Sequence, residues 1–214
     1  MAFLFFAGGE IMDKWRSLLS QINFTGAEYP TFTDTEIEEF EQKTGIILPQ
    51  DCKDYCKVFG NGMFSELYDI NCLNAKMAEE CKDDLLISWN MERDSLTKLI
   101  NRFGISKEEE EELTQVNQII ELITRSFVFA SKEEQFFLWD LDSYNNLNRS
   151  YKIWTVELEL PYFYCIGSDF FEFARDFCLG LNRHKYDYMH TSMRPEIYED
   201  LVGFERFPKE YGYD

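Results

Sequence analysis

The chain has few of the residues on which enzymatic and metal chemistry depends. Its only two histidines, His184 and His190, have a spacing that fits neither one helix face nor a zinc motif. The cysteines include no C-x-x-C pair, which argues against a structural zinc site. The phosphate loop, the dinucleotide fingerprint and the nucleophile elbow are all missing from the sequence. We therefore expect a protein that is not an enzyme and that holds no cofactor and no metal ion.

Basic residues are also scarce. Lys and Arg number 21 against 40 Asp and Glu, so the formal net charge is -19. Binding to nucleic-acid phosphates or to an anionic membrane surface relies on Lys and Arg, so this composition disfavours direct nucleic-acid and membrane partners. A basic protein partner would be attracted to this surface. The same charge also serves solubility alone, and both interpretations stay open.

Long apolar runs are lacking as well. Residues 3–7 are apolar, but no basic residue precedes them, unlike in a secretory signal. We therefore expect a cytoplasmic protein whose cysteines stay reduced: Cys52, Cys56, Cys72, Cys81, Cys165 and Cys178. Residues 1–11 are interpreted as an unstructured extension before a natural start at Met12, and residues 12–214 as one domain.

Aromatic residues are plentiful, with 20 Phe, 12 Tyr and 4 Trp, so the chain can bury a large core. Apolar residues recur at helical spacing in the first half. Thr33 and Glu36 form a capping-box pattern at the start of one helix, and Gly45 suits its end. Ser106 and Glu109 repeat the pattern at the start of a run of glutamates. We expect helices at 12–23, from Thr33 to Gly45, from Pro49 to Phe59, and at 73–81, 93–103, 106–125 and 169–180.

The second half changes to segments rich in Phe, Trp, Tyr, Ile and Val. We expect strands at 66–70, 85–88, 126–131, 136–141, 151–158 and 161–166. Helices followed by consecutive strands and a closing helix predict an α+β domain, in which an antiparallel β-meander is packed with helices.

The order of several short motifs resembles the SUKH superfamily, the fold of fungal cell-wall assembly regulators and many bacterial immunity proteins. The first block is Ile37-Glu38-Glu39-Phe40-Glu41, then Gly45, Leu48-Pro49, Tyr55 and Asn61-Gly62. The later block is Phe127-Val128-Phe129-Ala130, Phe136-Phe137-Leu138-Trp139-Asp140 and Ser168-Asp169-Phe170-Phe171-Glu172-Phe173. Between the two blocks, residues 89–125 look like a helical insertion relative to this family. The matching residues have structural roles, so they carry fold more firmly than function.

The resemblance implies a protein-binding domain without enzymatic activity. In bacteria it implies an immunity protein that neutralises a basic toxin, such as a nuclease, by direct binding, and the charge of -19 suits that role. We expect the contact surface at acidic strand ends and at the glutamate run, with these residues as candidates: Glu66, Asp69, Glu108, Glu109, Glu133, Glu134, Asp140 and Asp142.

Three other interpretations stay open at this point. One is a regulatory scaffold of the cell-wall assembly type, although the chain has no long disordered flanks of the kind expected for a scaffold. A second is an enzyme that uses a carboxylate pair such as Asp140 and Asp142, which would need a concave pocket and shifted pKa values. A third is an acidic domain that has lost its partner. Solvated charges at a strand end are the simpler account of Asp140 and Asp142.

Overall fold

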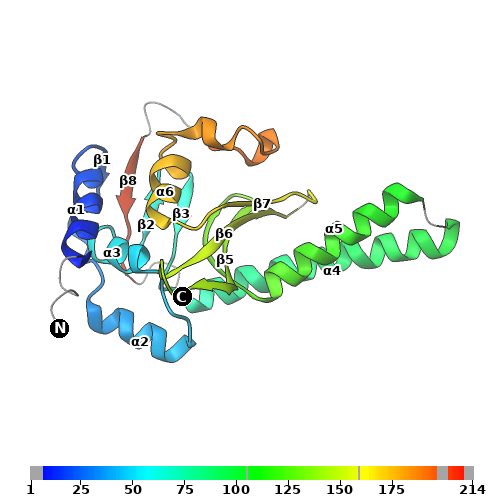
Figure 1. Cartoon of the computed structure of the whole chain (residues 1–214), viewed down its shortest axis with the longest axis horizontal. Coiled ribbons are helices and arrows are strands. Elements are labelled where there is room, and N and C mark those ends of the chain that lie inside the picture. Colours follow the sequence, from blue (N-terminus) through cyan, green and yellow to red (C-terminus); the bar gives the residue numbers. More distant parts are fainter. Residues whose placement is uncertain (1–6, 105, 159, 197–201, 210–214) are drawn as a thin grey trace.

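The protein folds as a β-sheet between helical layers, with a long helical hairpin projecting to one side (Figure 1). The computed structural model describes residues 7–104, 106–158, 160–196 and 202–209. Within these ranges, eight strands form one sheet in the order β1-β8-β2-β3-β4-β5-β6-β7. The predicted α+β class is confirmed.

The first helix begins earlier than the sequence pattern indicates. Helix α1 spans Ala7–Leu19, so the prediction of an unstructured extension over residues 1–11 is wrong for residues 7–11. Residues 1–6 lie outside the described residues. The apolar spacing begins only at residue 12, and Gly8 and Gly9 are poor helix formers, so no local signal indicates this first turn.

The next two helices begin and end at the predicted signals. Helix α2 (Asp34–Thr44) has the capping box of Thr33 and Glu36, and Gly45 ends it with φ 72°. Helix α3 (Gln50–Val58) follows Pro49 and buries Cys52, Tyr55 and Cys56.

The sheet is mixed because its first strand and its last strand pair in parallel. β2 (Gly62–Phe64) and β3 (Tyr68–Ile70) form an antiparallel hairpin. β8 (Gly203–Arg206) pairs antiparallel with β2, and β1 (Asn23–Thr25) pairs parallel with β8. The prediction of a purely antiparallel meander is therefore wrong at this edge. The C-terminal strand inserts between two N-terminal strands, a non-local pairing that no short sequence pattern announces.

The rest of the sheet is the predicted antiparallel meander. Its strands are β4 (Ser126–Lys132), β5 (Gln135–Asn145), β6 (Ser150–Glu157) and β7 (Phe163–Gly167). The expected closing helix divides into a short α6 (Phe170–Glu172) and a π-helical segment, Phe173–Cys178. Two 3-10 turns follow, at Arg183–Tyr186 and Thr191–Met193.

Helices α4 (Ala75–Phe103) and α5 (Lys107–Thr124) form the hairpin that projects past the sheet, here called the arm (Figure 1). The predicted insertion is confirmed as helical, but it begins at Ala75. The predicted strand at 85–88 is wrong, because Leu85, Trp89 and Leu96 form the buried stripe of one continuous helix. No helix in the described ranges is both long enough and apolar enough to cross a membrane.

The two faces of the sheet have different covers. Phe129 and Phe137 point to the face covered by α1, α3 and α6, where Phe129 contacts Phe170 with ring centroids 5.5 Å apart. Val128 and Ala130 lie on the opposite face, where Ala78 of α4 packs against them. The aromatic core therefore lies on one face, and the base of the arm covers the other.

Candidate functional site

The acidic residues predicted at the turns are largely exposed. Glu66 lies in the β2–β3 turn with a positive φ of 56°. Glu133 and Glu134 form the β4–β5 turn, and both side chains are exposed. Asp69 of β3 is only half-exposed, and Asn71 Nδ2 donates a hydrogen bond to its carboxylate over 2.7 Å. Burial raises the pKa of Asp69 to about 6, against the weaker effect of that hydrogen bond.

Asp140 does not have the solvated position expected for it. Its side chain is buried, and Arg125 Nε donates to Asp140 Oδ1 over 2.9 Å. Asp142, two residues further along β5, is exposed. The prediction of an exposed Asp140 is therefore wrong, because Arg125 at the end of α5 covers it.

Glu108 and Glu109 lie in the first turn of α5, on the arm. The Glu109 carboxylate accepts a hydrogen bond from the Ser106 backbone N–H over 2.8 Å, and the Ser106 hydroxyl accepts one from the Glu109 N–H. This is the predicted capping box. Glu108 is exposed and Glu109 is half-buried, so the helix cap occupies one of these two carboxylates.

The eight predicted contact residues do not form one surface. Glu134 lies in the turn just before β5 and Asp140 lies within β5, six residues further on, which corresponds to about 20 Å of extended chain. Glu66 belongs to the β2–β3 turn, and Glu108 belongs to the arm. A single partner surface therefore uses only some of the eight.

Helix α4 carries four exposed apolar residues, here called the stripe, a set that was not predicted from the sequence. The exposed fractions are 60% for Ile87, 69% for Met91, 46% for Leu99 and 71% for Phe103. Four residues turn an α-helix by about 400°, so this spacing winds the stripe around α4, and Ile87 and Phe103 lie about 160° apart around the helix axis. The signal was present in the sequence, but the run at 85–88 was interpreted as a strand, which hid its helical periodicity.

Exposed charges of both signs lie beside this stripe. Lys98 and Arg102 are exposed near its second half, and the Arg102 guanidinium lies 5.1 Å from the centroid of the Phe103 ring. Between Ala75 and Thr124 the chain has twelve Asp and Glu against six Lys and Arg. Asp83, Asp84, Glu92 and Asp94 of α4 are exposed. Beside Met91, the arm and the end of β6 enclose a groove lined by Ser88, Trp89, Met91, Glu92, Ser95 and Leu158. An apolar strip with carboxylates along part of its rim is a surface suited to protein contact.

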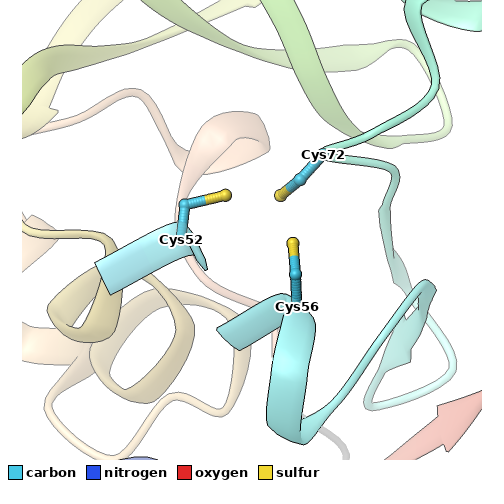
Figure 2. Close-up of side chains that lie close together, drawn as sticks. All are labelled: Cys52, Cys56 and Cys72. Atoms are coloured by element: carbon cyan, nitrogen blue, oxygen red, sulfur yellow. The ribbon is translucent and has the colours of Figure 1, made fainter. Parts of the chain in front are cut away.

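A second arrangement lies inside the core. The sulfurs of Cys52, Cys56 and Cys72 lie within 4.8 Å of one another, and each residue is at most 1% exposed. Figure 2 shows two of the thiols coming from α3 and the third from the loop after β3. All six cysteines are free thiols in the structure.

The sequence has no C-x-x-C pair, and its cysteine spacing therefore predicted no metal site. Cys52 and Cys56 share one face of α3 through their i, i+4 spacing, which the sequence pattern did indicate. Cys72 joins them only because the β2–β3 hairpin returns the chain to α3. The sequence contains no signal for this third thiol.

The protonation of this thiol cluster is uneven. Burial raises the pKa of Cys52 and of Cys72 well above its ordinary value. Burial acts to raise the pKa of Cys56 as well, but hydrogen bonds from Cys52 and Cys72 and the nearby charge of Lys57 lower it to about 6. Negative charge in the cluster is therefore concentrated on Cys56.

Comparisons with known proteins add no relative to this picture: no family model matches the chain, and neither the curated proteins nor the solved structures gave a match.

Proposed function

We propose that this chain is a non-enzymatic binding protein that holds a basic protein partner against its arm, and that it acts as an immunity protein neutralising a toxin. The single observation that carries the proposal is the exposed stripe of Ile87, Met91, Leu99 and Phe103 beside exposed carboxylates. The resemblance to the SUKH superfamily supports the choice of a toxin as the partner.

The physical argument combines two interactions. Apolar side chains that leave water on binding contribute about 25 cal/mol per Å² of buried apolar surface. Exposed carboxylates beside them attract a cationic partner and speed its association, an effect that salt weakens. Met91 and Phe103 are the two most exposed apolar residues of the stripe, so they are its expected anchors.

Residues of the stripe can be substituted without disturbing the core. Trp89 is 2% exposed and packs into the core, whereas Met91, two residues along the same helix, is 69% exposed. We expect Met91→Ser with Phe103→Ser to change the free energy of unfolding by no more than about 0.5 kcal/mol for each substitution, because surface substitutions are near neutral. We expect Trp89→Ala to cost about 3–5 kcal/mol. Urea unfolding of the three proteins checks that the double variant is folded before any binding experiment.

The binding experiment compares three tagged proteins in pull-downs from a lysate of the source cells: the wild type, the Met91→Ser/Phe103→Ser double variant, and Leu147→Ser. Leu147 is 93% exposed on the β5–β6 turn and serves as the matched control. We expect one basic protein to be retained by the wild type and by the control and lost by the double variant. Its association rate is expected to fall as salt rises.

Rescue then tests the biological role. The captured protein is expressed in cells together with each variant, and we expect the wild type and Leu147→Ser to restore growth while the double variant does not. A basic partner that the double variant holds as tightly as the wild type does would contradict the use of the arm. Several weak partners without toxicity would favour the regulatory scaffold instead.

A further inference from the structure

The thiol cluster of Cys52, Cys56 and Cys72 is separate from the arm, and the proposed binding function does not use it. We infer that these three sulfurs form a binding site for one Cu(I) ion. The metal class follows from the ligands, because soft thiolates select Cu(I), zinc and iron–sulfur clusters among biological metals.

The number of ligands distinguishes between these metals. Structural zinc takes four ligands, and iron–sulfur clusters are held by four cysteines or by two cysteines and two histidines. In the described residues, no fourth His, Cys, Asp or Glu atom completes the group around these sulfurs. A monovalent soft ion accepts low coordination numbers, and three sulfurs can hold it at the centre of their triangle. The triangular array in Figure 2 has this arrangement.

The dimensions fit with little movement. With a metal–sulfur distance near 2.3 Å, sulfurs at the corners of a trigonal site are roughly 4 Å apart. The three sulfurs already lie within 4.8 Å of one another. Small rotations about the Cα–Cβ bonds close the difference, and the backbone of α3 fixes the positions of Cys52 and Cys56.

Tyr55 provides an independent observation. Its side chain is 0% exposed, and among the described residues its hydroxyl has no hydrogen-bond partner. Burial raises the pKa of Tyr55 well above its ordinary value, and the nearby Cys72, Cys56 and Cys52 raise it further. The hydroxyl is therefore an unused donor within electrostatic range of the thiols. A metal-bound thiolate is a stronger hydrogen-bond acceptor than a neutral thiol. Such outer-shell hydrogen bonds stabilise metal ligands.

Cu(I) binding to the thiols is expected to release protons. Cu(I) displaces the protons of the thiols, because the thiolate is the ligand form. Affinity is therefore expected to rise with pH.

The experiment titrates the full chain with Cu(I) under anaerobic conditions, in competition with a chromogenic Cu(I) chelator. Because the cluster is buried, the ion is added both to the native protein and during refolding. We expect one Cu(I) per chain, and X-ray absorption of the wild-type complex is expected to show a shell of sulfur atoms only. Cys165→Ser is the control, since Cys165 is exposed and lies outside the cluster, and it should bind as the wild type does.

Two kinds of variant probe the site. Cys52→Ser, Cys56→Ser and Cys72→Ser should each abolish retention of Cu(I) against the chelator. Tyr55→Phe keeps the aromatic ring that packs on Phe59, removes only the unpaired hydroxyl, and should weaken Cu(I) binding about tenfold. If a serine variant does not fold, the wild-type absorption spectrum and the Tyr55→Phe affinity still decide the matter.

Four results would overturn the inference. They are no Cu(I) held against the chelator, nitrogen or oxygen ligands in the absorption spectrum, unchanged affinity in a folded Cys56→Ser, and preferential retention of Zn(II). In each case the three thiols serve only as apolar packing in the core, as buried cysteines commonly do.

Discussion

Arg125 and Asp140 join the base of the arm to the sheet. Arg125 follows the last residue of α5, and its Nε donates to Asp140 Oδ1 over 2.9 Å. The Leu141 N–H also donates to the Arg125 carbonyl over 3.2 Å. The two residues are unequal, because the side chain of Asp140 is 9% exposed and that of Arg125 is 39% exposed.

Because Asp140 is more buried than Arg125, we expect substitutions at the two residues to lower the free energy of unfolding by different amounts. Arg125→Ala leaves a buried carboxylate without its cation, and we expect the free energy of unfolding to fall by about 2 kcal/mol. Asp140→Asn keeps a neutral acceptor and lets Arg125 turn to water, so we expect a loss below about 1 kcal/mol. Urea unfolding measures both. Arg93→Ala, which removes an exposed pair with Asp94, is the control and should change little. Equal losses at Arg125 and Asp140 would contradict this account.

Replacing Asp69 with a neutral residue is expected to stabilise the protein at neutral pH but not at acidic pH. Burial raises the pKa of its carboxyl to about 6 in the folded protein, so the native state binds this proton more tightly than the unfolded chain does. The native state therefore loses stability as pH rises from about 4 through about 6. Asp69→Asn removes that loss and still accepts the hydrogen bond from Asn71.

We expect Asp69→Asn to raise the free energy of unfolding by about 2 kcal/mol at pH 7, because one pKa unit corresponds to about 1.4 kcal/mol and the group is partly solvated. At pH 4 the variant and the wild type should be nearly equal. Unfolding curves at both pH values measure the difference, with Asp142→Asn, an exposed carboxylate on β5, as the control. A gain that is the same at both pH values would show that the carboxyl does not titrate as described.

Arg206 of β8 is expected to hold the last strand in the sheet. Its Nε, Nη1 and Nη2 donate to the carbonyls of Phe59, Tyr29 and Val58 over 2.6, 2.8 and 2.8 Å. A lysine cannot reproduce this planar fork, so at least one buried carbonyl loses its donor. We expect Arg206→Lys to lower the free energy of unfolding by about 2 kcal/mol.

Hydrogen exchange locates the effect of this substitution. The amides of β8 and β1 should exchange faster in Arg206→Lys, while those of β5 and β6 keep their protection unless the whole protein unfolds. Arg183→Lys, at an exposed position in a 3-10 turn, is the control. An unchanged stability together with unchanged exchange in β8 would mean that strand pairing alone holds the C-terminal segment.

Local signals determined much of the fold. The capping residues Thr33 and Ser106 start their helices where the sequence predicts, because each satisfies backbone N–H groups within one turn. The strands from β4 to β7 also lie where β-branched and aromatic residues cluster. The prediction of a strand at 85–88 is wrong because a short run with three apolar residues, Leu85, Leu86 and Ile87, fits a buried strand or a buried helix equally well.

The sequence by itself determined the α+β class, the caps and the acidic charge, because each depends on composition or on residues within one turn or one strand. Only the tertiary structure decided which groups meet. It covered Asp140 with Arg125, inserted β8 between β1 and β2, and brought Cys72 to Cys52 and Cys56. These contacts depend on the closure of long loops and on the packing of one face of a sheet, and a linear pattern encodes neither in any short segment.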